Sequence, residues 1–195
     1  MLLNNSLVVA SGNLGKVNEF RELLSSLPLN VLSQPVGLDI KETGSSFAEN
    51  ARIKALTVSL ITKEWVLADD SGLSVEALNG APGIFSARYA KTDSERINKL
   101  LKELEPFDNR KATFIAALCI ASNGKVLLEV EGKCNGLITR LPRGKEGFGY
   151  DPIFEVLNLG LTFAEMGIEK KKAFGHRGCA FQLLMPGLKK LLGLS

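Results

Sequence analysis

The sequence feature that limits the fold most strongly is an almost entirely apolar run, Ala112 to Ala121. A strand with one face in water alternates apolar and polar residues, and because this run does not alternate it predicts a fully buried strand. Asn123 and Gly124 follow, and Asn-Gly is a strong signal for a tight hairpin turn. Val126 to Cys134 is then the antiparallel partner. The sequence predicts a long two-stranded arm that frames one lobe of the molecule.

The remaining pattern predicts an α/β fold in a chain of 195 residues. That length suits a single domain, residues 1–195, built as two lobes around a substantial core. Short apolar runs predict strands, and apolar residues at helical spacing predict helices. The predicted elements are strands at Ser6–Ala10, Leu29–Leu32 and Val66–Ala68, a helix spaced from Val17 to Leu27, helices opened by capping boxes at Ser46/Glu49 and Thr92/Glu95, and a last helix that Pro186 kinks or divides.

Composition excludes several classes of protein. The formal net charge of +3 is too small to indicate a nucleic-acid binder. Three cysteines in no metal-ligand or disulfide spacing, together with one histidine, argue against a zinc site and suit a reducing compartment. The N-terminus has no basic region before its apolar run, and no stretch has transmembrane length. We therefore expect a cytoplasmic protein with neither a membrane nor a nucleic acid as partner.

The segment from Val66 to Ala90 carries the densest chemistry. Its predicted strand meets two adjacent carboxylates, Asp69 and Asp70, followed by Ser71. Side chains alternate faces along a strand, so only one of the two aspartates should point into a given cleft. A carboxylate at a strand end can hold a hard cation or accept a proton from water. The alternative is a solvated turn in which these side chains only satisfy backbone groups.

A glycine-containing loop, residues Ser11 to Lys16, connects the first strand to the first helix. A strand, a glycine loop, a lysine and a helix in this order offer backbone N–H groups and a helix N-terminus to phosphate. The spacing is not that of a Walker A loop, since Val17 follows the lysine. A tight turn with a surface lysine explains the loop equally well.

Three further positions have both a structural and a functional interpretation. Glu42 lies on a loop outside the capped helix, where a glutamate is usually only solvated. Phe148 beside Gly149 can present a ring face to a flat ligand, or it can belong to a turn with core aromatics. Arg177 stands near a predicted helix start, where a cation is disfavoured unless something anionic or electron-rich faces it. Its neighbour His176 fits either interpretation.

Five motifs together resemble one family, the inosine triphosphate pyrophosphatases, also called XTP/dITP diphosphatases. They are SGNLGK at 11–16, ETGSSFAENARIKA at 42–55, ADDSGLSVEALNGAPGIFSARYA at 68–90, FGYDPIF at 148–154 and HRG at 176–178. They occur in the family's order and cover the chain nearly end to end. The resemblance implies an elongated two-lobed α/β domain. In such a domain helices flank a long mixed central sheet, the active-site cleft lies between the lobes, and the molecule is commonly a homodimer.

The resemblance also implies an activity and a set of roles. The family cleaves ITP, dITP and XTP between the α and β phosphates, which releases a monophosphate and pyrophosphate and keeps deaminated purines out of DNA and RNA. Asp70 matches the catalytic carboxylate, and Glu42 and Asp70 match the residues that hold Mg²⁺. The matching triphosphate loop is Ser11, Gly12, Asn13, Leu14, Gly15 and Lys16, and the other matching substrate contacts are Ser71, Phe148, Gly149, Tyr150, Asp151, Lys171, His176 and Arg177.

The sequence departs from the family pattern at two positions. Gly175 stands where the family usually has serine before His-Arg, and Lys172 stands where it often has asparagine. We expect the first change to affect selectivity, not the reaction. Two alternatives stay open: a pyrophosphatase of modified pyrimidine nucleotides, and a nucleotide- or nucleic-acid-binding module without turnover that uses the basic stretches 140–145 and 170–172.

Overall fold

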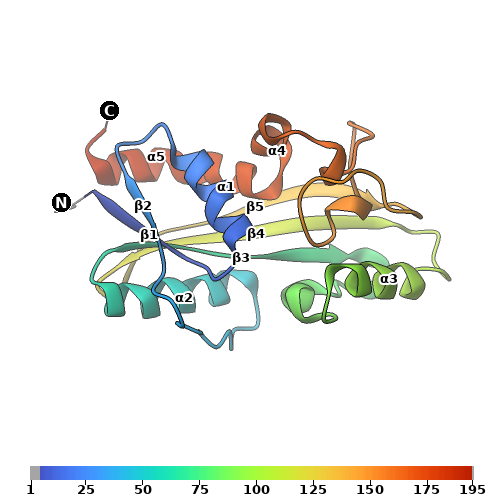
Figure 1. Ribbon diagram of the computed structural model, residues 1–195, viewed down its shortest axis with the longest axis horizontal. Coiled ribbons are helices and arrows are strands. Elements are labelled where there is room, and N and C mark those ends of the chain that lie inside the picture. The colour runs from blue at the N-terminus through green and yellow to red at the C-terminus, as the bar shows by residue number, and fades with distance from the viewer. Residues whose placement is uncertain (1–4, 195) are drawn as a thin grey trace. The chain divides into compact units, whose positions relative to one another are not determined.

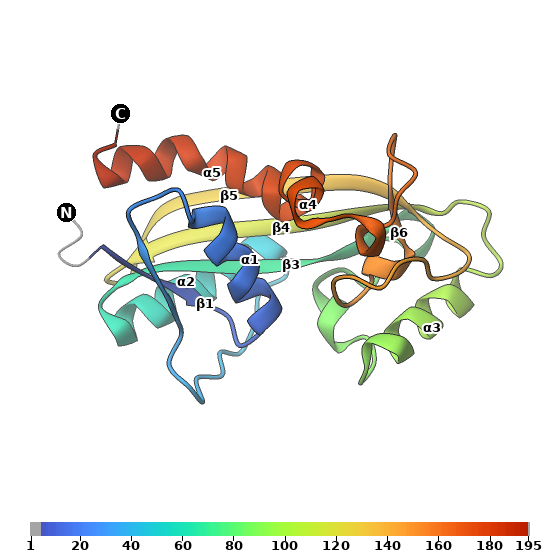
Figure 2. The ribbon, with the colours of Figure 1, turned by 45° about the horizontal axis from the view of Figure 1, so that its top comes forward.

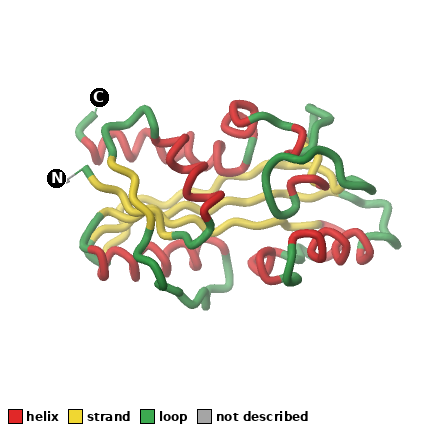
Figure 3. Tube along the Cα trace, in the orientation of Figure 1, coloured by secondary structure: helices red, strands yellow, loops and turns green. Residues whose placement is uncertain are grey.

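A computed structural model describes residues 5–194, whose backbone forms a mixed six-stranded sheet with flanking helices (Figures 1 and 3). The strand order is β2-β1-β3-β4-β5-β6. The central strand of the N-terminal part, β1 (Ser6–Ala10), pairs in parallel with both β2 (Asn30–Ser33) and β3 (Trp65–Val75). β4 (Lys111–Ser122) is followed by β5 (Lys125–Ile138), which pairs antiparallel with β6 (Phe154–Val156). The predicted α/β class with a mixed sheet is confirmed.

The chain divides into two compact units. Unit 1 contains the described residues up to Asp70, residues 116–132 and the chain from Ala180 onward, and unit 2 contains residues 71–115 and 133–179. Three strands and one helix therefore contribute residues to both units, namely β3, β4, β5 and α5 (His176–Leu192). That the whole chain works as one nucleotide pyrophosphatase domain stays a prediction.

In unit 1, helices cover both faces of the strands. α1 (Leu14–Leu24) and the unit 1 part of α5 pack on one face, where they share a core with β1, β3 and β4. α2 (Phe47–Thr62) covers the other face, which Figures 1 and 2 show clearly. Residues at helical spacing make these contacts: Val17, Phe20 and Leu24 on α1, Ala51, Ala55 and Val58 on α2, and Ala180, Leu184 and Leu188 on α5.

One predicted helix end is wrong, and the last helix is not divided at its proline. α1 ends at Leu24 and not at Leu27, because the N–H and Oγ of Ser25 both bond to the carbonyl of Glu22 and close the last turn. α5 continues through Pro186 without division. Leu184 and Leu188 on either side of the proline are both buried, so both halves of the helix pack in the core.

The strand that carries the paired aspartates is longer than predicted. Asp69 and Asp70 lie in the middle of β3 and not at its end. The strand continues because Leu73 and Val75 are fully buried in the core of unit 2. β1, however, ends at Ala10, whose partner in the register is Ala68. The two aspartates are therefore the first residues of β3 beyond the end of its parallel neighbour, which places them beside the loop that leaves β1.

In unit 2, α3 (Asp93–Glu103) begins with both hydrogen bonds of the predicted capping box between Thr92 and Glu95. β5 extends past its predicted end through Gly136, where an added Cβ would lie 2.3 Å from the carbonyl oxygen of Glu155 on β6. A short helix, α4 (Ile168–Phe174), precedes α5. Within residues 5–194, none of these helices combines the length and the apolarity that crossing a bilayer requires.

Candidate active site

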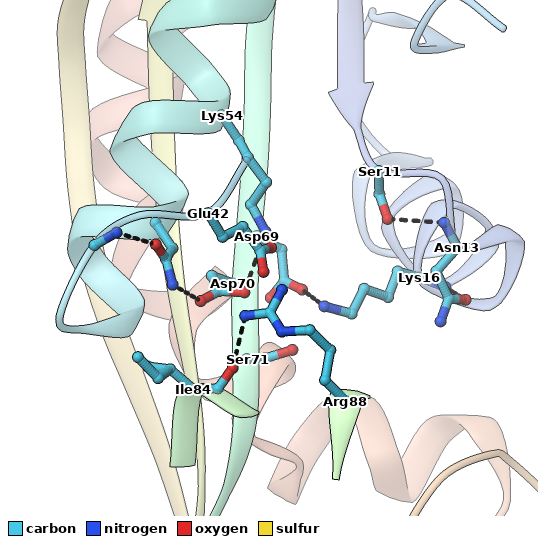
Figure 4. Close-up of polar contacts among 12 residues, drawn as sticks. Ser11, Asn13, Lys16, Glu42, Lys54, Asp69, Asp70, Ser71, Ile84 and Arg88 are labelled. Atoms are coloured by element: carbon cyan, nitrogen blue, oxygen red, sulfur yellow. Dashed lines mark hydrogen bonds and ion pairs between the residues drawn. The ribbon is translucent and has the colours of Figure 1, made fainter. Parts of the chain in front are cut away.

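The two adjacent aspartates face different lysines within unit 1. Asp69 Oδ2 lies 2.7 Å from Nζ of Lys16, which belongs to α1. Asp70 Oδ1 lies 3.1 Å from Nζ of Lys54, which belongs to α2 (Figure 4). Side chains alternate along β3, so Asp69 turns toward Lys16 and Asp70 toward Lys54. The two pairs still form one cluster, because Lys16 also acts on the charge of Asp70 and Asp69 on that of Lys54. Asp69 and Asp70 are both buried, so each ion pair is largely shielded from water.

The Lys54 ammonium group bridges the two predicted metal ligands, Glu42 and Asp70. Its Nζ lies 2.7 Å from Glu42 Oε1 and 3.1 Å from Asp70 Oδ1, so two carboxylates share one ammonium group. Burial opposes the charge on Lys54, but Asp70 and Glu42 together raise its pKa. Burial also raises the pKa of Asp70, with Lys54 opposing the shift and Glu42 adding to it. A carboxylate with a raised pKa is the better proton acceptor near neutral pH.

A buried asparagine, Asn50, connects this pair to the loop that carries Glu42. Asn50 Oδ1 accepts the N–H of Gly44 at 2.8 Å, and its Nδ2 donates to Asp70 Oδ2 at 3.1 Å. Neither Asn50 nor Lys54 was among the predicted site residues. Their spacing was the available signal, because residues four apart on a helix lie on the same face. Only half of the predicted capping box at Ser46 and Glu49 forms. Ser46 Oγ accepts the Glu49 N–H, but the Glu49 carboxylate accepts from the N–H and the hydroxyl of Ser45.

The loop after β1 folds into the first turn of α1. Ser11 Oγ accepts the N–H of Asn13 at 3.1 Å, and Asn13 Oδ1 accepts the N–H of Lys16 at 3.2 Å, which caps the helix (Figure 4). Leu14 and Gly15 thus belong to the helix and not to a loop. An added Cβ at Gly12 would meet nothing within 4 Å, so packing does not require glycine there. The helix N-terminus and Lys16 stand beside Asp69.

A second group of predicted residues gathers in unit 2. Arg177 Nη2 donates to Ser71 Oγ at 2.7 Å, and the Arg177 guanidinium lies 5.7 Å from the centroid of the Phe148 ring. The His176 ring stacks on Phe114 with 4.7 Å between centroids and 16° between planes. His176 and Arg177 are both buried and begin α5, as their sequence position predicted. These residues bring aromatic ring faces and a guanidinium group together, a combination that suits a flat, electron-rich ligand.

The rest of the Phe148 motif points into the protein. Asp151 Oδ2 accepts the Phe148 N–H at 3.0 Å and pairs with Lys171 Nζ at 2.7 Å. An added Cβ at Gly147 would lie 2.0 Å from the same oxygen, so only glycine leaves room for this contact. The Tyr150 hydroxyl donates to the carbonyl of Ser86 at 3.0 Å, and burial raises the Tyr150 pKa. In this structure Asp151, Lys171 and Tyr150 hold the loop in place.

Gly175 has a steric explanation in the contacts of its neighbours. Its backbone is extended, at φ −72° and ψ 154°, so no left-handed conformation demands glycine. An added Cβ would, however, lie 2.5 Å from the carbonyl oxygen of Lys171. Serine at this position would require the end of α4 to move. Lys172, the other departure from the family pattern, places its Nζ 3.1 Å from Glu169 Oε1.

Gly178, the last residue of the His-Arg-Gly motif, is the position least tolerant of a side chain. An added Cβ would lie 1.9 Å from the carbonyl oxygen of Lys172, which is backbone and cannot turn aside. We expect Gly178→Ala to lower the free energy of unfolding by about 3 kcal/mol through overpacking, measured by urea denaturation. Gly167→Ala is the control, because a Cβ there meets nothing within 4 Å. Equal stability of the two variants would contradict the predicted clash.

Two carboxylates of unit 1 fit a divalent cation. Glu42 and Asp70 already converge on one cation, the Lys54 ammonium, and carboxylate oxygens are the ligands that small hard cations prefer. Residues 5–194 hold no group of three or more His, Cys, Asp or Glu side chains arranged around a metal position. An open site with two protein carboxylates, completed by water and substrate phosphates, is the usual arrangement for such a cation at a nucleotide.

Fold and site together define an α/β protein that sets paired carboxylates and lysines beside a helix N-terminus. The model of the Ham1 family matches residues 7–187, and the chain belongs to that family. It is 65% identical over 190 residues to a dITP/XTP pyrophosphatase of Prochlorococcus marinus (strain NATL1A), covering 97% of both chains. A solved HAM1 protein from Coxiella burnetii superposes with a TM-score of 0.88 at 44% identity, over 97% of this chain and 100% of that one. The Staphylococcus aureus Ham1 protein gives 0.84 at 38%, over 95% and 98%.

Proposed function

We propose that this protein hydrolyses the non-standard purine nucleotides ITP, dITP and XTP to a nucleoside monophosphate and pyrophosphate. The observation that carries the proposal is the pair of carboxylates, Glu42 and Asp70, held on one shared ammonium. The relative from Prochlorococcus, whose printed name is dITP/XTP pyrophosphatase, supports the same reaction. Removing such nucleotides would keep deaminated purines out of DNA and RNA.

Asp70 accepts a proton from the attacking water in this proposal. Burial raises its pKa, which brings the carboxylate closer to the affinity for protons that a general base needs. Glu42 and Asp70 would hold Mg²⁺, which when bound supplies positive charge to the triphosphate and the departing pyrophosphate. Lys16, Lys54 and the N–H groups of the first turn of α1 would bind the phosphates.

The base would lie against the residues gathered in unit 2. Hypoxanthine and xanthine carry an acceptor oxygen at C6, where adenine carries an amino donor. A buried donor on His176 or Arg177 pairs with the oxygen and loses its partner against adenine, a mismatch worth a factor of roughly 10⁴. The Phe148 ring offers a stacking face. Guanine shares the C6 oxygen, so its rejection requires another contact.

Product analysis tests the proposal. The purified protein is incubated with ITP, ATP, GTP and pyrimidine triphosphates, with and without Mg²⁺, and pyrophosphate is separated from orthophosphate. We expect metal-dependent pyrophosphate from ITP and little from ATP or GTP. Preferred turnover of modified pyrimidine nucleotides would favour that alternative. Binding without any product would favour a module without catalysis and would contradict the proposal.

We also propose that the protein is a cytoplasmic homodimer, on the resemblance to its family. Sedimentation equilibrium would test the assembly: a single species at twice the 21.1 kDa chain mass is expected. A monomer across the micromolar range would contradict it. Cell fractionation would test the location.

A further inference from the structure

The first residue of α3, Asp93, contacts the loop that carries Phe148. Asp93 Oδ2 accepts the N–H of Gly149 at 2.8 Å, across 56 positions of sequence. Its other oxygen, Oδ1, lies 2.5 Å from Nη1 of Arg96, one turn along the helix. The Arg96 Nε in turn donates to the carbonyl of Ala90 at 3.1 Å, which fixes the pair to the chain before the helix. Asp93 is thus held in one position while it holds the loop.

This contact sets the direction of the Phe148 backbone. The N–H of Gly149 belongs to the peptide group that follows Phe148, so its orientation is determined by ψ of Phe148. The peptide group on the other side of Phe148 is fixed by the bond from its own N–H to Asp151. Gly149 itself adopts φ +61°, a conformation that glycine enters readily and leaves readily. A glycine in this position needs an external partner to keep the loop in one state.

We propose that Asp93 is a positioning residue. By holding the loop, it would keep the Phe148 ring beneath Arg177, where the ring can orient the base. The inference rests on the proposed function and extends it to a residue outside the predicted site. α3 otherwise serves packing, through Ile97 and Leu100. A carboxylate at the first position of a helix also stabilises the helix, because it interacts favourably with the helix dipole. The test must therefore separate helix stability from loop position.

Steady-state kinetics with ITP compares three variants. Asp93→Ala removes the acceptor, and we expect KM to rise about 10-fold while kcat changes less than about 2-fold, as for the loss of one charge-assisted hydrogen bond. Asp93→Asn keeps an oxygen acceptor, and KM should stay within about 3-fold of the wild type. Thr92→Ala removes the cap of the same helix and should lower the midpoint of thermal unfolding by about 2–4 °C with KM unchanged. A rise in KM in Thr92→Ala equal to that in Asp93→Ala would overturn the inference.

A double-mutant cycle asks whether Asp93 acts through the ring. In a Phe148→Ala background, Asp93→Ala should change KM by less than about 2-fold, because the side chain that it positions is gone. A full 10-fold effect in that background would show that Asp93 acts elsewhere.

Binding of inosine 5′-monophosphate, measured by calorimetry on the same variants, separates this inference from the proposed function. If the wild type binds IMP but turns over no ITP, and Asp93→Ala weakens binding about 10-fold, the reaction is wrong and the positioning role stands. If the wild type hydrolyses ITP and Asp93→Ala matches it in KM and in IMP affinity, the positioning role fails alone. A wild type that neither binds IMP nor hydrolyses ITP overturns both.

Discussion

Asp70→Asn is expected to lower kcat for ITP by roughly 10³-fold while the protein stays folded, as general-base groups contribute factors of about 10² to 10⁴. Asparagine has nearly the shape of aspartate but cannot accept a proton at neutral pH, and it offers a cation a neutral oxygen in place of a charged one. Steady-state and single-turnover assays with ITP and saturating Mg²⁺ measure the loss. KM should change less than kcat, because the lysines and the base contacts remain.

The fold should tolerate this change because of the charges around Asp70. Asp70 belongs to a cluster of three carboxylates and two ammonium groups: Lys16, Glu42, Lys54, Asp69 and Asp70. Removing one carboxylate charge therefore leaves equal numbers of positive and negative charges. Lys54 keeps Glu42 as a partner, and the amide oxygen can still accept from Asn50. We expect the free energy of unfolding to stay within about 1 kcal/mol of the wild type.

Asp108→Asn is the matched control, since that carboxylate is fully exposed and should alter neither property. Normal turnover of Asp70→Asn would remove Asp70 from the mechanism. An unfolded Asp70→Asn variant would instead give the carboxylate a structural role.

Lys54→Met should impair both stability and turnover. Methionine matches the length of the aliphatic stem but leaves Glu42 and Asp70 facing each other without the ammonium group that they share. Breaking a buried ion pair from one side typically costs about 3–5 kcal/mol, and we expect about 3 kcal/mol in urea denaturation without metal. If Lys54 binds the triphosphate as proposed, losing this cation should lower kcat/KM by about 10². Added Mg²⁺ should restore part of the stability, because in the proposed function it binds the folded state at the same two carboxylates.

Two further variants serve as controls for Lys54→Met. Lys125→Met removes a lysine from an exposed position of β5 and should leave stability and turnover unchanged. The double variant Lys54→Met/Asp70→Asn removes the repulsion together with the cation and should recover most of the lost stability. If Lys54→Met were as stable as Lys125→Met, the shared ammonium would contribute nothing to folding.

The sequence by itself determined the features that depend on neighbours along the chain. β1 has the predicted bounds, Thr92 and Glu95 form the predicted capping box, and Asn123-Gly124 joins β4 to β5. Each of these is decided within a few residues by apolar periodicity, capping chemistry or turn preference. The order of the five motifs likewise predicted the family, which the comparisons confirm. The roles of the predicted site residues stay predictions.

Only the tertiary structure decided how those residues are partnered. The local pattern Asp-Asp-Ser-Gly favours the end of a strand, yet β3 continues because burial of Leu73 and Val75 outweighs local preference. Lys54 lies against Glu42 and Asp70, and Asp93 binds the N–H of Gly149, because helix packing brings together residues that are 12, 16 and 56 positions apart. Such contacts depend on how whole elements pack, and the free energy that selects the packing is distributed over the core and not encoded in any short segment.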